Sequence, residues 1–179
     1  ADAYFGQAFG LERPLYFGAK GLPTLTFGRP DWFHQVGTEV ACAHSEAAVF
    51  DQSTLGKIDV FGADAALFLN RVCANQMDRA VGRAIYTTML NERGGIESDL
   101  TAIRLSQTHF RLFVGTSAIR RDLAWLSRHV GEARVTLDDV TAQFATLALV
   151  GPRAAQILND VGAGELNELS FFAAGDSTL

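Results

Sequence analysis

Two carboxylates, Glu97 and Asp99, open a predicted strand in the stretch NERGGIESDLTAIRL, residues 91–105. Side chains on a strand alternate between its two faces, so both carboxylates lie on one face. The residues that share this face are Glu97, Asp99, Thr101, Ile103 and Leu105. The face is therefore polar at its start and apolar at its end. Such a gradient is typical of a pocket rim, and it also fits a strand that simply emerges into solvent.

A tyrosine joins one of these acids if the preceding strand pairs as its length predicts. We expect strands over residues 85–90 and 97–105 to form a hairpin around a loop at 91–96. The predicted pairs are Leu90 with Glu97, Thr88 with Asp99 and Tyr86 with Thr101. Tyr86 and Asp99 then become diagonal neighbours whose backbones lie about 7 Å apart. An aromatic ring beside one acid suits a flat ligand with nitrogen donors, and a surface pair is the alternative.

The elements expected around this hairpin are short helices and strands. We expect helices over 37–49, 64–73 and 117–130, and a further helix that Pro152 opens and Gly162 closes. The remaining expected strands cover residues 58–61, 110–115, 135–137 and 146–150. Apolar residues recur at helical spacing in the third helix, whose Trp125 is expected in the core. This order predicts an α+β fold in which helices cover one face of a mostly antiparallel sheet.

Residues 1–36 differ from the rest of the chain. They hold five of the 13 phenylalanines and three of the 4 prolines, without a sustained hydrophobic period. We therefore expect an extended, aromatic-rich arm or linker from a preceding domain, which packs on another domain or on a second copy of the chain. A homo-oligomer formed through the arm is one outcome. The globular domain would then span residues 37–179.

Composition excludes several classes of partner. The 179-residue chain is 48% hydrophobic, with a net charge of -5 and no cluster among its 15 basic residues, so nucleic acid is not an expected partner. No run approaches the roughly 18 apolar residues that cross a bilayer, and the first residues do not resemble a signal peptide. We expect no membrane association, and a cytoplasmic location, or the mitochondrial matrix if the source is eukaryotic.

The sequence lacks the residues that the common metal-binding and nucleotide-binding motifs require. Cys42 and Cys73 have no metal-type spacing, which predicts buried thiols in a reducing compartment and no metal site. The stretch 55–58, LGKI, lacks the first glycine and the Ser or Thr of a P-loop. Residues 162–164, GAG, begin like a dinucleotide motif, but Asn167 occupies the third glycine position. We expect no FAD or NAD bound by such a motif in this chain.

A family resemblance is carried by three segments: VFDQSTLGKIDVFGADAALFLNRV (49–72), GRAIYTTMLNERGGIESDLTAIRL (82–105) and RRDLAWLSRHV (120–130). In order and spacing they resemble the folate-binding aminomethyltransferase family of the glycine cleavage T-protein. The form GGIESDLT, in which Ser98 replaces one of two adjacent acids, resembles the C-terminal domain of sarcosine and dimethylglycine dehydrogenases. FGLERPLYF, residues 9–17, is similar to the segment that joins that domain to the preceding FAD domain.

The resemblance implies roles for individual residues. An aspartate at the position of Asp99 contacts the 10-nitrogen of tetrahydrofolate and is essential to one-carbon transfer. Tyr86 matches a tyrosine that lines the folate site, and Leu55 matches a hydrophobic contact. Thr101 and Ile103 are weaker candidates on the Asp99 face.

Glu97 is given no family role. One departure from the family pattern qualifies this set. Where T-proteins read VNAAN, this chain reads VGTSA at 114–118, so the amide that helps to hold the pterin is absent or replaced, and Thr116 stands among the candidate ligand contacts.

The resemblance also implies an activity. The cofactor would be tetrahydrofolate, converted to 5,10-methylenetetrahydrofolate with a one-carbon unit from a methylated amine such as sarcosine or dimethylglycine. FAD would belong to an amine-oxidase domain that precedes this chain. The family's distal YxGExGxE segment is not reached, so we expect a domain truncated at its C-terminal end and inactive in isolation. The alternative is a noncatalytic folate-binding or docking module of the same family.

Overall fold

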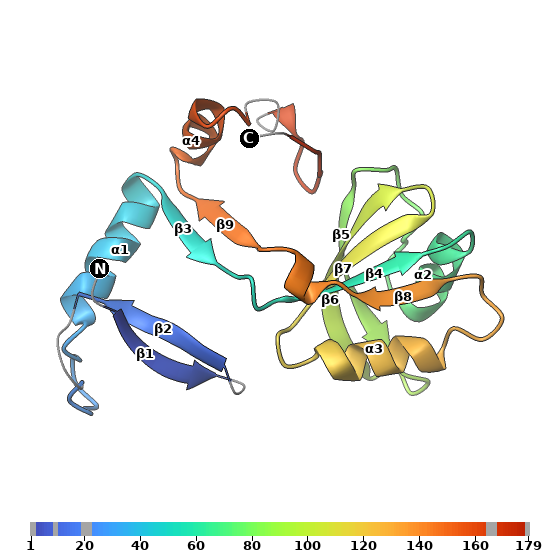
Figure 1. The fold of residues 1–179 in the computed structure, drawn as a ribbon, viewed down its shortest axis with the longest axis horizontal. Helices are drawn as coiled ribbons and strands as arrows, with labels where there is room; N and C mark the ends of the chain where they lie inside the picture. The colour runs from blue at the N-terminus through green and yellow to red at the C-terminus, as the bar shows by residue number, and fades with distance from the viewer. Residues whose placement is uncertain (1–2, 9–10, 19–22, 164–167, 178–179) are drawn as a thin grey trace. The chain divides into compact units, whose positions relative to one another are not determined.

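The computed structural model describes residues 3–8, 11–18, 23–163 and 168–177, and Figure 1 shows the fold. The chain forms two compact units. The first comprises Ala1–Phe50 and Ala148–Ile157, and the second comprises Asp51–Leu147 and Leu158–Leu179. The predicted carboxylate strand lies in the second unit, which therefore contains the candidate site.

The second unit is built on a five-stranded sheet in the order β5-β6-β7-β4-β8. Its strands are β4 (Gly56–Phe61), β5 (Ala84–Leu90), β6 (Ile96–Ser106), β7 (His109–Val114) and β8 (Thr136–Asp139). Each neighbouring pair runs antiparallel. Together with the helices of the chain, this sheet confirms the predicted α+β class with mostly antiparallel pairing.

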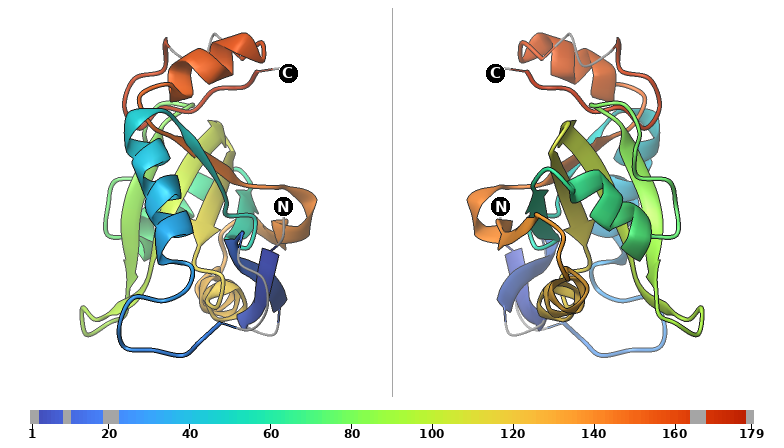
Figure 2. Two further views of the ribbon diagram at one scale, coloured as in Figure 1. Left: turned by 90° about the vertical axis from the view of Figure 1, so that its left-hand side faces the viewer. Right: turned by 90° about the vertical axis from the view of Figure 1, so that its right-hand side faces the viewer.

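Helices α2 (Ala65–Val72) and α3 (Ile119–Arg128) supply the apolar side chains that cover one face of this sheet. The strand residues in this core include Ile58, Val60, Leu100, Ala102, Leu112 and Val114, which alternate along β4, β6 and β7. Trp125 of α3 belongs to the same core and is 7% exposed, as its helical spacing predicts. Figure 2 shows the sheet and both helices from two further directions. The opposite face of the sheet carries Tyr86 and Asp99.

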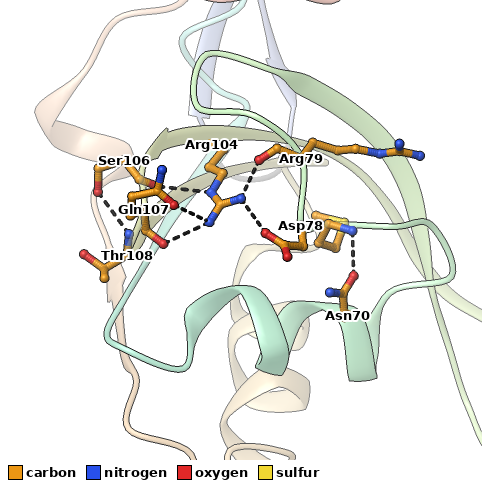
Figure 3. Close-up of polar contacts among 8 residues, drawn as sticks. Asn70, Asp78, Arg79, Arg104, Ser106, Gln107 and Thr108 are labelled. Atoms are coloured by element: carbon orange, nitrogen blue, oxygen red, sulfur yellow. Dashed lines mark hydrogen bonds and ion pairs between the residues drawn. The ribbon is translucent and has the colours of Figure 1, made fainter.

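A buried arginine, Arg104, closes one end of the core face of β6. Its guanidinium donates to Asp78 Oδ1 at 2.6 Å, to the backbone carbonyl of Arg79, and to the backbone and side-chain oxygens of Gln107 at 3.2 and 3.1 Å (Figure 3). Its Nε also donates to the carbonyl of Ser106. These bonds tie the segment that follows α2 to the β6–β7 turn. Buried charge is well compensated here, which is what a low-dielectric interior requires.

The first unit contains a β-hairpin where the sequence suggested an extended arm. Strands β1 (Ala3–Ala8) and β2 (Leu11–Phe17) pair antiparallel, and their register shifts at the point where Phe5 meets Pro14. A proline cannot donate to the ladder, so an irregular position in a two-stranded hairpin accommodates it. Tyr16 is 5% exposed and stacks on Tyr4 with ring centroids 5.2 Å apart. These residues are thus extended strands paired with each other, and the packing of the arm on another domain or a second copy stays a prediction.

Some of the arm lies outside the described residues, namely residues 1–2, 9–10 and 19–22. The origin of residues 1–36 as a linker from a preceding domain stays a prediction.

Helix α1 runs over Phe33–Ser45, so it begins and ends about a turn earlier than expected. The following strand β3 (Ala48–Asp51) was not predicted, because the helix was expected to extend to residue 49. It pairs with β9 (Leu147–Val150).

The remaining elements agree with the sequence more closely. A short 3-10 helix covers Thr141–Gln143, and α4 covers Ala154–Asp160 between Pro152 and Gly162.

One further correction concerns Cys42, which was expected to be buried. It is exposed, whereas Cys73 is buried, and burial raises the pKa of the Cys73 thiol to about 12. The difference follows from position, since Cys73 lies at the end of a core helix and Cys42 lies on α1, which has no buried residue.

Candidate active site on the open sheet face

Tyr86 of β5 and Asp99 of β6 lie on one face of the sheet, and their side chains meet. The Tyr86 hydroxyl donates to Asp99 Oδ2 at 3.1 Å. The hairpin pairs Thr88 with Asp99 and Tyr86 with Thr101, as the loop length predicts. The expected Leu90–Glu97 pair is wrong: the register shifts between Met89 and Leu90, so that Leu90 pairs with Ile96. The irregularity falls at the turn and leaves the candidate site unchanged.

The electrostatics of the pair favour a phenol that stays protonated. The hydrogen bond to the Asp99 carboxylate raises the pKa of Tyr86, and the negative charge itself acts in the same direction. Tyr86 is 54% exposed and Asp99 is also exposed. Within the described parts of the chain, Oδ1 of Asp99 receives no hydrogen bond. One carboxylate oxygen is thus oriented by the protein while the other is open to a ligand.

Glu97 has a different environment from Asp99. It is partly buried, and its Oε1 accepts a hydrogen bond from Asn91 Nδ2 at 2.9 Å. Asn91 Oδ1 in turn accepts the backbone N–H groups of Arg93 and Gly95 at 3.0 and 2.9 Å. Glu97 therefore supports the β5–β6 turn.

Thr101 and Ile103 lie on the Asp99 face and are partly buried. The other two candidates, Leu55 and Thr116, come from turns that flank β4 and β7, and both are partly buried. Thr116 Oγ1 donates to Thr54 Oγ1 at 3.2 Å, which joins these two turns. No hydrogen bond between described residues links Leu55 or Thr116 to Asp99. The sheet register therefore brings Tyr86, Asp99, Thr101 and Ile103 together on one face. The other two candidates, Leu55 and Thr116, lie in turns outside the sheet.

Charged residues of β4 were missed as part of this face. Asp59 is 2% exposed and accepts both Nε and Nη2 of Arg111 at 2.8 Å. The Arg111 guanidinium lies 3.7 Å from the centroid of the Phe144 ring. His109 Nε2 lies 3.0 Å from Asp59 Oδ2 but lacks hydrogen-bond alignment with it. The alternation of GKIDVF does indicate that the charged residues share one strand face. The same alternation is typical of a solvated face, so it does not reveal that they are buried.

A cavity of about 460 Å³ adjoins Tyr86. Asn75, Arg79, Arg83, Ala84, Ile85, Phe171 and Phe172 complete its lining. Its volume lies in the range of small-molecule sites. The described residues contain no group of three or more His, Cys, Asp or Glu side chains arranged to hold a metal ion. No helix in the described ranges is long and apolar enough to cross a membrane.

A model of the GCVT N-terminal domain matches residues 1–179. The chain belongs to this family. Among curated relatives, it is 36% identical over 160 residues to the aminomethyltransferase of Bacillus pumilus, covering 87% of this chain and 43% of that protein. A solved structure, the glycine cleavage system aminomethyltransferase T of Bartonella henselae, superimposes with a TM-score of 0.76 at 29% identity. That match covers 97% of this chain and 43% of the Bartonella chain, and it supports the mixed α/β fold with antiparallel sheets.

GCVT relatives with other names also match. The chain is 34% identical over 164 residues to the mitochondrial pyruvate dehydrogenase phosphatase regulatory subunit of mouse, covering 87% of this chain and 19% of that protein. It is 33% identical over 162 residues to 4-methylaminobutanoate oxidase (formaldehyde-forming) of Paenarthrobacter nicotinovorans, covering 89% and 20%. The chain thus spans less than half the length of these curated relatives. The predicted family resemblance is confirmed, and the relatives include aminomethyltransferases and an amine oxidase.

Proposed function

We propose that this chain forms part of a tetrahydrofolate site for one-carbon transfer. Asp99 would contact the 10-nitrogen, and Tyr86, Thr101 and Ile103 would line the same face. Leu55 and Thr116 would approach from their turns. The observation that carries the proposal is the Tyr86–Asp99 hydrogen bond of 3.1 Å on an open sheet face of a GCVT domain.

The residues present fit a reduced folate in two respects. The exposed ring of Tyr86 offers a flat surface beside the Asp99 carboxylate. Asp99 keeps one oxygen free for an N–H group or a nearby positive charge of the ligand. The folate would supply the nucleophilic nitrogens. The protein must then orient that nucleophile and accept or stabilise a proton, and one fixed carboxylate is enough for this role.

The source of the carbon is a further part of the proposal. A relative named as a formaldehyde-forming methylaminobutanoate oxidase supports a link to the oxidation of methylated amines. We propose that a longer protein contains this chain after an FAD-dependent amine-oxidase domain, as in sarcosine and dimethylglycine dehydrogenases. Its product would be 5,10-methylenetetrahydrofolate. The location would be the cytoplasm, or the mitochondrial matrix in a eukaryote.

Nuclear magnetic resonance on the 179-residue chain tests the folate site directly. Titration with 5-formyltetrahydrofolate should shift the resonances of Tyr86, Asp99, Thr101 and Ile103, with weak affinity because the chain covers less than half of its relatives. Unshifted resonances at millimolar ligand, or shifts confined to α2 and α3 on the opposite side of the sheet, would overturn the proposal.

A noncatalytic role is the second candidate, because one relative is named as a regulatory subunit. The two candidates differ in the product of the longer protein. Incubation with sarcosine or dimethylglycine, an electron acceptor and tetrahydrofolate should yield methylenetetrahydrofolate if the first candidate is correct. Folate binding without turnover of any methylated amine would instead favour the docking module.

A further inference from the structure

Lys57 of β4 is a fully buried lysine, 0% exposed, on the face of the sheet that carries Tyr86. Its orientation follows from the strand register. One row of paired residues crosses four strands and contains Tyr86, Thr101, Phe113 and Lys57. Cross-strand partners point to the same face, so Lys57 lies at the inner end of the row that begins with the exposed tyrosine.

The Lys57 ammonium binds the turn that precedes β4. Its Nζ donates to the backbone carbonyls of Ser53 and Leu55 at 2.9 and 3.0 Å. Because the ammonium lies on the Tyr86 side of the sheet, these bonds draw the turn toward that side. The turn is also joined to Thr116, whose hydroxyl donates to Thr54. Lys57 is thus connected to both candidate ligand residues that lie outside the sheet.

A cation in this position has an energetic cost that an ordinary core residue would not have. Burial lowers the pKa of Lys57 and Arg111 acts in the same direction, while Asp51 and Asp139 oppose the shift. Methionine has a similar length and would fill the same space without a charge. It would leave the carbonyls of the partly buried Ser53 and Leu55 without this donor, and loss of a hydrogen-bond partner away from bulk water is itself costly. The lysine therefore fixes the turn in a way that an apolar side chain cannot.

We infer that Lys57 is a positioning residue, which holds Leu55, and through Thr54 also Thr116, beside the row that ends at Tyr86. The inference rests on the proposed folate site and adds a residue that does not touch the ligand. Lys57 acts through the backbone of the turn, and its ammonium is enclosed by protein.

The first test needs no ligand. In the 179-residue chain, Lys57→Met should increase the mobility of the Leu55 methyl groups and speed amide exchange at residues 53–55. The resonances of Tyr86 and Asp99 should stay in place, since the β5–β6 register does not involve Lys57. If the methionine variant does not fold, Lys57→Gln replaces it in this test. Glutamine is shorter and reaches at most one carbonyl, so it should have the same effect. A Leu55 turn that stays ordered in a folded variant would overturn the inference.

The second test is a double-mutant cycle on the affinity for 5-formyltetrahydrofolate. Lys57→Met and Leu55→Ala should each weaken binding by about tenfold, as expected for loss of one apolar contact, and their effects should not add. The matched control pair, Lys57→Met with Tyr86→Phe, should be additive because the two residues act independently. Additive effects of Lys57→Met and Leu55→Ala would contradict positioning through Leu55. If the wild-type chain does not bind the folate, the proposed function fails, while the ligand-free test still decides the role of Lys57.

Discussion

The Tyr86 hydroxyl donates to Asp99 Oδ2 from a diagonal position on the neighbouring strand, at 3.1 Å. The pair depends on one register, in which Tyr86 faces Thr101 and Thr88 faces Asp99. A slip by one residue would turn one partner toward the helices and separate them. The turn between β5 and β6 therefore fixes the geometry of the candidate site as firmly as the two side chains do.

The Tyr86 phenol should report the charge of Asp99. The carboxylate raises the pKa of Tyr86 through its hydrogen bond, so Asp99→Asn should lower that pKa toward the ordinary tyrosine value. Tyrosine ring resonances followed from pH 8 to 12 would measure the change. Glu97→Gln is the matched control and should leave the Tyr86 titration in place, because Glu97 binds Asn91. An unchanged Tyr86 pKa in Asp99→Asn would show that the hydrogen bond is absent in solution.

An ion pair between Asp64 and Arg134 should make stability depend on acid pH. Both Asp64 oxygens accept the Arg134 guanidinium at 2.9 Å, and this contact lowers the pKa of Asp64 to about 2. A depressed carboxyl pKa stabilises the fold above the unfolded value of about 3.9, and this contribution is lost as pH falls toward 2. Thermal unfolding of wild type and Asp64→Asn should differ at pH 6 and converge near pH 2. A difference in midpoint that stays constant across this range would refute the assignment.

The two cysteines should differ sharply in reactivity. Cys42 is exposed, whereas Cys73 is buried and burial raises its pKa to about 12, so Cys73 has little thiolate at neutral pH. Ellman's reagent should titrate one thiol quickly in the native chain and the second only after unfolding. The single variant Cys42→Ser should abolish the fast phase. A fast phase that survives in Cys42→Ser would mean that Cys73 is accessible.

The N-terminal hairpin should influence association. Phe5, Leu15 and Phe17 are 52%, 56% and 42% exposed, so β1 and β2 present apolar side chains to solvent. Such a surface favours packing against another domain or a second copy of the chain. Deletion of residues 1–28 should change the sedimentation coefficient beyond the effect of mass, or the solubility. Unaltered self-association and solubility would show that the hairpin has no such partner.

The site hairpin could be predicted because its information is local. Alternating residues and a glycine turn set the positions of Tyr86, Thr88 and Asp99 without help from the rest of the fold. The N-terminal hairpin could not, because its pattern is aperiodic and Pro14 argues against a strand. Its stability involves the stack of Tyr16 on Tyr4 and contact with Trp32, which is distant in sequence.

The buried charges of β4 illustrate a second limit. Lys57 and Asp59 alternate with Ile58 and Val60, which is the pattern of a strand with one solvated face. Asp59 can be buried because Arg111 of β7 pairs with it, and Lys57 because its ammonium donates hydrogen bonds to two carbonyls of the preceding turn. The spacing of residues along the sequence does not identify Arg111 or the turn carbonyls as these partners. Tertiary compensation of charge is therefore the part of the site that sequence patterns did not reveal.

We propose that Asp99, and not Glu97, is the carboxylate that acts on the folate nitrogen during one-carbon transfer. In the longer protein that we propose, Asp99→Asn should lower methylenetetrahydrofolate formation by about 10²- to 10⁴-fold, the usual contribution of a general acid or base. Amine oxidation should continue and release formaldehyde. Glu97→Gln should change either rate by less than about threefold, as expected for a carboxylate with little coupling to the site. Both products measured for both variants decide the matter: loss of folate product in Asp99→Asn alone is the predicted result, and normal folate product from Asp99→Asn would contradict the account.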